Sequence, residues 1–310
     1  LSRPNHPDSG DVQEAMILDT LLQDLRYAIR GLRTKPWFAA AVIVTLGLGI
    51  GANSAMFGIV DRLLFRPPPM MKDFDRVHRT YLYNTIRGTE RTCCSGQFAR
   101  YKDFERLNTH LEKVAAFAAR DIAVGVGDAA REMRVAPVSS NFFGLFDAPP
   151  VLGRYFTALE DSTPSGEAVV VLSNAAWKTQ YGSRKDVLGT TVQIGPLVYT
   201  IIGVAPPGFV GLWPDRPPLF YIPIVNYAHS QNPSFLRGGN NWWETYSWGW
   251  LSVVVVRKKD VPFEVANADM SNVFKKSYDL QRLEQTTITP PEIAKPRAVL
   301  GSYFIERGPG

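Results

Sequence analysis

The amino-acid sequence predicts an α+β protein: an amphipathic N-terminal helix and one transmembrane helix, followed by a large domain of mixed helices and strands. Three observations predict it. Residues 37–60 carry no charged side chain, residues 16–36 carry one apolar stripe, and short alternating and helical patterns interleave after residue 66. We therefore divide the chain into a leader (1–15), an amphipathic helix (16–36), a transmembrane helix (37–60) and a domain (66–305).

Composition limits the class of protein. The chain has 310 residues, of which 45% are hydrophobic and 20% charged, as in a folded protein. The net charge of +5 is spread along the chain and gives no reason to expect a nucleic-acid partner. The two cysteines, Cys93 and Cys94, are adjacent, which suits neither a disulfide between them nor a closed zinc site.

The segment before the uncharged run reads as a helix on a membrane surface. Residues 1–15 are polar and aperiodic, so we expect a disordered leader, with Met16 as the natural start. From Ile17 to Lys35 the apolar residues recur at three-to-four spacing, opposite an arginine-rich face. Pro36 then ends this helix just before the interfacial aromatic Trp37. The alternative is a surface helix of a soluble domain.

Two incompatible interpretations fit residues 42–57, VIVTLGLGIGANSAMF. Gly47, Gly49 and Ala52 match the dinucleotide fingerprint G-x-G-x-x-A. However, the 24 uncharged residues of 37–60 would span about 36 Å as a helix, enough for a hydrocarbon core of roughly 30 Å. The prolines of RPPPMMKDF also preclude the second strand, which would supply a ribose-binding acid. We therefore predict a transmembrane helix and no cofactor, and keep a cleaved signal sequence as a further alternative.

The small residues of this span predict a helix-packing face. Gly47, Gly51 and Ala55 follow each other at four-residue spacing, which lets another membrane helix approach closely. Basic residues lie on both sides of the span. Because cytoplasmic flanks are enriched in Lys and Arg, those before the span slightly favour a cytoplasmic N-terminus.

The first half of the large domain alternates between strand and helix patterns. We predict a strand at 77–83, and a helix at 97–107 that continues towards Ala119 after a break near Asn108. We also predict a hairpin from 122–126 and 133–138.

The second half continues in the same way. A strand at 169–172 precedes a helix at 174–181 capped by Ser173, and strands at 191–194 and 198–204 form a hairpin. A central strand at 251–256, a helix from Pro262 to about Tyr278 and a last strand at 297–305 complete the prediction.

No catalytic set emerges. The four histidines are scattered, and the chain has neither the G-x-x-x-x-G-K-[ST] loop nor a G-x-S-x-G elbow, so we expect no enzyme, no cofactor and no metal. The segment 240–250, NNWWETYSWGW, is rich in aromatic residues. Trp242, Trp243 and Tyr246 could face a ligand or partner, or they could pack in the core, which is the simpler account.

Several longer stretches resemble the MacB/FtsX-type permeases of bacterial ABC transporters. The family's N-terminal elbow and first transmembrane helix resemble LLQDLRYAIRGLRTKPWF (21–38) and TLGLGIGANSAMFGIVDRLLFRPPP (45–69). Its periplasmic core domain resembles VSSNFFGLFDAPPVLGRYF (138–156), VVVLSNAAWKTQYG (169–182) and YTIIGVAPPGF (199–209).

The resemblance implies a two-lobed outer domain in which one lobe interrupts the other, here at about 165–245. It also implies a separate cytoplasmic ABC ATPase whose ATP-driven closure moves the outer domain for export or efflux, a second permease copy and membrane lipid as partners. The location implied is the bacterial inner membrane, with the N-terminus cytoplasmic and the large domain extracytoplasmic.

The chain departs from the family in having one membrane helix where relatives have at least four, so we expect an N-terminal fragment. The alternative function is a single-span anchored binding module that uses the tryptophan-rich segment 240–250.

Overall fold

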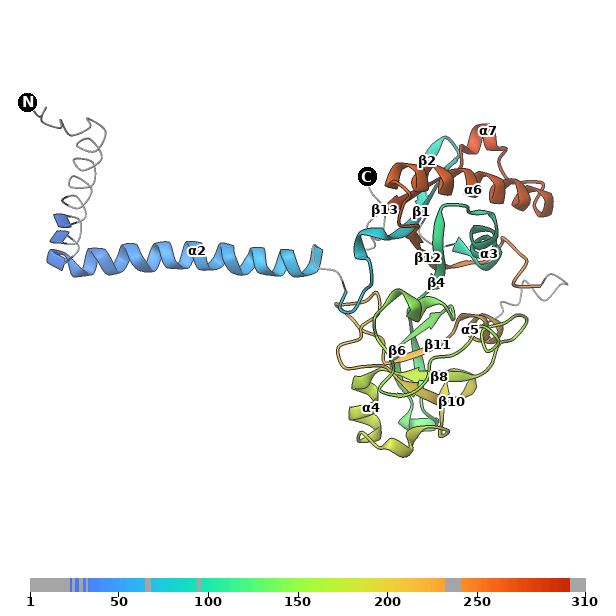
Figure 1. The fold of residues 1–310 in the computed structure, drawn as a ribbon, viewed down its shortest axis with the longest axis horizontal. Coiled ribbons are helices and arrows are strands. Elements are labelled where there is room, and N and C mark those ends of the chain that lie inside the picture. The colour runs from blue at the N-terminus through green and yellow to red at the C-terminus, as the bar shows by residue number, and fades with distance from the viewer. Residues whose placement is uncertain are drawn as a thin grey trace, which may run out of the picture. The chain divides into compact units, whose positions relative to one another are not determined.

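A computed structural model describes residues 23, 26–27, 30–31, 33–64, 68–93, 96–231 and 241–301 (Figure 1). The chain divides into two compact units, Leu1–Arg66 and Pro67–Gly310. The predicted leader, most of the predicted amphipathic helix and the end of the last predicted strand lie outside the described residues.

The first unit contains the helix α2, Pro36–Leu64. The segment Pro36–Gly58 has a mean hydropathy of 1.7 and, apart from Ala39, is exposed, so this helix is long and apolar enough to cross a membrane. The backbone is helical throughout residues 42–57, which leaves no strand and no turn for a dinucleotide loop. Lys35 interrupts the helical residues on its two sides, consistent with a break at Pro36.

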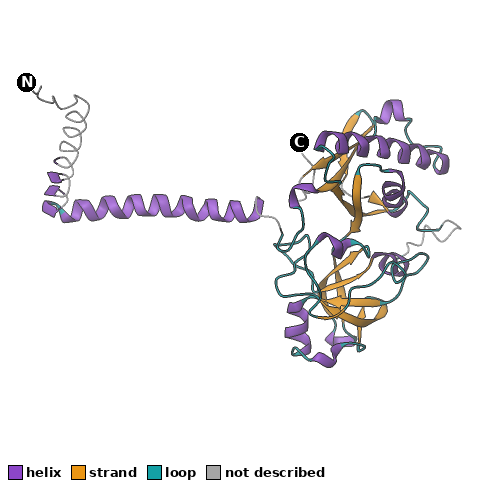
Figure 2. Cartoon of the chain, in the orientation of Figure 1, coloured by secondary structure: helices purple, strands orange, loops and turns teal. Residues whose placement is uncertain are grey.

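The second unit is built on one 13-stranded sheet. Part of it, the sheet–helix lobe, joins strands from both ends of the unit with three helices (Figures 1 and 2). Its strands are β1 (Val77–Ile86), β2 (Thr89–Cys93), β3 (Gly96–Gln97), β4 (Leu111–Phe117), β12 (Gly249–Arg257) and β13 (Arg297–Gly301). Its helices are α3 (Phe98–Leu107), α6 (Phe263–Glu284) and α7 (Pro291–Ala294).

Six further strands close into a ring, in the order β11–β8–β10–β9–β5–β6 and back to β11. They are β5 (Arg120–Val124), β6 (Arg131–Val138), β8 (Val169–Leu172), β9 (Thr191–Ile194), β10 (Leu197–Val204) and β11 (Phe220–Pro223). The short β7 (Leu152–Gly153) pairs with β10. The helices α4 (Asn174–Tyr181) and α5 (Ile224–Ser230) complete this ring lobe, together with 3₁₀ turns that include η3 (Phe142–Leu145).

Period-two alternation divides the core between the two lobes. On β12, Leu251, Val253 and Val255 face the helices, whereas Val254 and Val256 face an aromatic cluster around η3. On the ring strands, alternate residues fill the inside of the ring, among them Val170, Ile201, Phe220 and Ile222. The strands β8, β11 and β12 are therefore buried on both faces, which explains their continuous apolar runs.

The predicted helix beyond Asn108 is wrong, because residues 111–117 form β4 beside the central strand β12. Asn108 ends α3: its Nδ2 donates to the carbonyl of Phe104 (2.6 Å), and its Oδ1 accepts from the backbone N–H of Leu111 (3.2 Å). Pairing with β12 then overrides the helical propensity of LEKVAAF.

Several other local predictions are confirmed. The strand β8 and the helix α4 begin and end where the sequence predicts, and Ser173 Oγ accepts the backbone N–H of Ala176 at 3.1 Å as the helix cap. The two predicted hairpins are β5–β6 and β9–β10. The boundary of 165–245 for an inserted lobe stays a prediction, and the ring draws its strands from residues 120–223.

Candidate functional site

The helix α3 places two charged side chains inside the sheet–helix lobe. Arg100 is 3% exposed and Asp103 is 6% exposed, although both lie on a helix that also buries Phe98 and Phe104. Buried charges are costly unless they are hydrogen-bonded, so their partners decide what this part of the core can do.

Arg100 is held by side chains from β3 and α6. Its Nε donates to Gln97 Oε1 at 2.8 Å and its Nη1 donates to Ser277 Oγ at 3.2 Å, while its Nη2 donates to Gln281 Oε1. The guanidinium also lies over the rings of Phe274 (4.8 Å) and Tyr246 (5.2 Å). The group therefore has a fixed position.

Asp103 lies at the centre of a second set of bonds. Its Oδ2 accepts the hydroxyls of Ser277 (2.6 Å) and Tyr246 (2.5 Å), and its Oδ1 accepts from Arg106 at 3.0 Å. Burial raises the pKa of the Tyr246 phenol, and the bond to Asp103 raises it further. The phenol therefore stays a hydrogen-bond donor at physiological pH.

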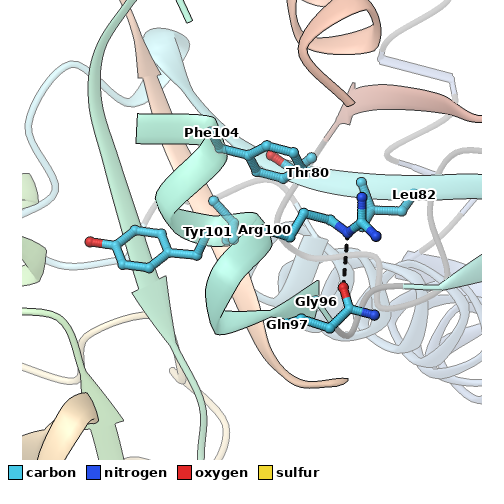
Figure 3. Close-up of a pocket in the computed structure, with 8 residues that line it drawn as sticks. Thr80, Leu82, Gly96, Gln97, Arg100, Tyr101 and Phe104 are labelled. Carbon is cyan, nitrogen blue, oxygen red and sulfur yellow. Dashed lines mark hydrogen bonds between the residues drawn. The ribbon is translucent and has the colours of Figure 1, made fainter. Parts of the chain in front are cut away.

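Arg100 lies below a cleft. It lines a small pocket of about 10 Å³ with Gln97, Thr80 and Phe104. Figure 3 shows the bond between Arg100 and Gln97, with Tyr101 pointing to the opposite side of α3. Arg100 and Gln97 also line a larger open cleft of about 580 Å³. Pockets of this volume are large enough for small organic ligands.

The β1–β2 hairpin forms one wall of this cleft, which we call the hairpin cleft. Asn84 and Arg91 are directly opposite each other in the antiparallel register, and both line it. The other wall is α6 with the loop 287–289, which Tyr278 fixes by donating its hydroxyl to the carbonyl of Thr289 at 2.8 Å.

The tryptophan-rich segment lies mainly in the core. Trp242 is 2% exposed, packs edge-on against Phe98 at 5.0 Å and donates its indole N–H to Pro164 O at 3.2 Å. Tyr246 is 9% exposed and bonds to Asp103, so both side chains are largely buried, as the simpler account expects. Tyr246 also lines an open pocket with Glu244 and Leu283, and its role towards a ligand or partner stays a prediction. Trp243 is half-buried against Trp242, and its role as a partner contact stays a prediction.

The small residues of α2 are all on the surface of the helix. Gly47 and Gly51 have no other atoms within 4 Å of the position where a side chain would begin, and Ala55 is exposed. Within the described part of the chain, no element packs on them, and helix packing through this face stays a prediction.

The sequence did not reveal Arg100, Asp103 and Ser277 as a set. The signal present was a charged pair at three-residue spacing on an α3 face that otherwise reads as apolar. Its partner Ser277 is 174 residues further along the chain, and local pattern carries no information on such a pairing. Among the described residues, no group of three or more His, Cys, Asp or Glu side chains could hold a metal ion.

Known proteins share this architecture. Among solved structures, a domain of a permease protein from Porphyromonas gingivalis has a TM-score of 0.53 and 12% identity, covering 76% of this chain and 92% of its own. The periplasmic region of MacB from Actinobacillus actinomycetemcomitans has a TM-score of 0.50 and 16% identity, covering 74% of this chain and 100% of its own. No curated protein matches the sequence.

At these identities the two structures show a common fold. The family profile described as "MacB-like periplasmic core domain" matches residues 39–273, which is most of the chain. The chain therefore belongs to the family of ABC transporter permeases with a MacB-like periplasmic core domain.

Proposed function

We propose that this chain is a permease subunit of a MacB-like ABC transporter that couples ATP-driven motion in a separate cytoplasmic ATPase to its extracytoplasmic domain, for export or efflux. The observation that carries the proposal is one chain that joins an exposed apolar helix, Pro36–Gly58, to a MacB-like domain. These 310 residues contain no P-loop, and the proposal assigns ATP hydrolysis to a separate ATPase subunit.

The first residues of the second unit are well placed to carry a movement into the domain. The backbone N–H of Lys72 donates to Leu145 O at 2.9 Å, and that of Asp147 donates to Met70 O at 2.7 Å. Met71 also forms a β-bridge with Phe146. This start segment, residues 70–72, is thereby tied to η3.

The turn η3 in turn lies in the aromatic cluster on one face of the sheet. Phe143 stacks on Tyr155 at 3.9 Å, and Phe142 is fully buried beside Phe117 of β4. Dense packing transmits displacement because it leaves no free volume to absorb it. A pull on the start segment therefore acts on residues that contact both β4 and the ring strand β11, through Tyr221.

The same proposal includes location and further partners. We place the chain in the bacterial inner membrane with α2 in lipid and the N-terminus in the cytoplasm. A second permease copy packs on the face made by Gly47, Gly51 and Ala55, whose exposure leaves room for a close helix–helix contact.

Co-purification tests the ATPase partner. The tagged protein is extracted from membranes of its host in mild detergent, and we expect an ABC ATPase subunit and vanadate-sensitive ATP hydrolysis in the eluate. An unrelated tagged single-span protein is the control. Purification of the chain from membranes without any ABC ATPase would contradict the proposed coupling.

A labelling experiment tests the orientation. Single cysteines at Ser183, on the exposed surface of the ring lobe, and at Ser9 are introduced into a variant in which Cys93 and Cys94 are serine. We expect a membrane-impermeant maleimide to label position 183 but not position 9 in intact spheroplasts. The opposite labelling pattern would overturn the orientation.

A further inference from the structure

The hairpin cleft has an unbalanced set of charges. It is lined by Arg91 and Arg100, together with hydroxyl and amide side chains, and none of the described residues that line it is acidic. Its remaining walls are apolar, with Leu82, Ile86 and Ile288 among them. A cleft with cationic donors and an apolar interior fits a ligand with an anionic group and an apolar body.

The two charged neighbours on β2 differ in their position relative to the cleft. Arg91 lines the cleft, whereas Glu90 does not. Glu90 is held by Arg297, whose Nε and Nη2 donate to its carboxylate at 3.1 and 3.2 Å. The nearest acid in sequence is thus kept away from the cleft by a bidentate ion pair.

The two arginines differ in their readiness for a ligand. Arg91 is exposed, and among the described residues it makes no ion pair or hydrogen bond. Arg100 is fixed in the floor by Gln97, Ser277 and Gln281 and contributes a positive potential. Arg91 is therefore the group that can close on an anion in a bidentate fashion.

The opposite wall is preorganised. Phe274, Tyr278 and Gln281 lie along one face of α6, and all three line the cleft. Gln281 is held by bonds to Arg100 and to Gln285 (2.9 Å). A ligand would meet a wall that is already ordered, which lowers the entropic cost of binding.

We propose that the hairpin cleft binds a small organic carboxylate with an apolar body, which places its carboxylate on Arg91 and its apolar part against Ile86, Ile288 and Phe274. The proposal concerns the described residues of the sheet–helix lobe and does not depend on an ATPase partner or on the orientation of α2.

Binding of 2-naphthoate to the full chain in lipid nanodiscs, measured by calorimetry, tests the proposal. We expect saturable binding of 2-naphthoate and weaker binding of its neutral amide. Arg91→Gln should lower the affinity about tenfold, the effect expected for loss of a charge-assisted hydrogen bond. Arg91→Lys should retain part of the affinity because it keeps the charge.

Two further variants make the result specific to the cleft. Arg87→Gln removes another exposed charge, from the turn of the same hairpin and outside the cleft, and should leave the affinity unchanged. Asn84→Trp fills the cleft beside Arg91 and should abolish binding. Absence of naphthoate binding, equal binding of the amide, equal losses in Arg87→Gln and Arg91→Gln, or unchanged binding in Asn84→Trp would each overturn the proposal.

Discussion

At the scale of single residues, the domain buries polar groups in two ways. Arg100 and Asp103 have several partners each and form a connected network with Ser277 and Tyr246. Thr80 is different. The residue is 3% exposed, and its buried hydroxyl has no hydrogen-bond partner among the described residues. A satisfied network stabilises a unique core, whereas an unsatisfied hydroxyl costs free energy.

Thr80→Val should therefore stabilise the protein. Valine replaces the hydroxyl with a methyl group of similar shape, so the packing of β1 against β13 is kept and the desolvation cost is removed. We expect the free energy of unfolding to rise by about 1–2 kcal/mol, measured by thermal unfolding of the detergent-solubilised chain. Thr85→Val, at a half-exposed position of the same strand, is the control and should have little effect.

Asp161 should make stability depend on pH. Its Oδ2 accepts the backbone N–H of Ser140 at 2.8 Å and its Oδ1 that of Val225 at 3.0 Å, so it joins two distant segments. Burial raises the pKa of this carboxyl to about 7, against the opposing effect of the two N–H donors and of Lys102. Because the folded pKa is above the unfolded one, the proton stabilises the fold below about pH 4, and this stability is lost as the pH rises to about 7.

Asp161→Asn cannot ionise, so the wild type should lose stability relative to this variant between about pH 4 and pH 7, by roughly 1–3 kcal/mol. The absolute stability of the variant is not diagnostic, because the amide also loses one N–H bond. Asp128→Asn, on an exposed turn, corrects for the general loss of charge. Parallel pH profiles for the wild type and Asp161→Asn would refute the assignment.

At the scale of elements, close backbone contacts position the strands. The short strand β7 pairs antiparallel with β10 at two glycines, Gly153 opposite Gly203. A Cβ atom on Gly203 would lie 2.1 Å from Arg154 O, and one on Gly153 would lie 2.1 Å from Ile202 O. Gly153 also has a positive φ of 66°. Only glycine allows the two backbones to come this close.

Gly203→Ala should break the pairing of β7 with β10. Because the clash is with a backbone carbonyl, the strands have to separate. We expect the free energy of unfolding to fall by about 1–3 kcal/mol. Urea unfolding followed by tryptophan fluorescence measures the loss. Gly144→Ala is the matched control, since its added Cβ meets no atom closer than 3.6 Å. Equal midpoints for the two variants would contradict the close approach.

At the scale of the whole molecule, the two units differ in how much apolar surface they expose. α2 leaves large apolar side chains such as Leu48 and Ile50 exposed by 69% and 66%, whereas the second unit buries its apolar residues in three clusters. An exposed apolar surface of this size has to be covered by lipid or by another helix. The second unit buries its core by its own packing, without lipid or another helix.

Self-association of α2 is the prediction at this scale. Gly47→Ile and Gly51→Ile together should prevent close contact between two copies, because bulky side chains separate helices that pack through small residues. Energy transfer between labelled copies in liposomes should fall several-fold. Gly49→Ile lies about 200° around the helix from Gly47 and should have no effect. Unchanged transfer in the double variant would exclude this face as the contact.

The sequence alone determined the local elements of this protein, since capping at Ser173, turns at Gly195 and Pro196, and the uncharged run of α2 are set by neighbouring residues. The tertiary structure decided whatever depends on residues far apart in sequence. It made residues 111–117 a strand, closed the ring through β6 and β11, and joined Asp103 to Ser277. It also turned Trp242 inward. Local pattern reports the periodicity of a segment, whereas burial and pairing depend on a partner that the segment does not contain.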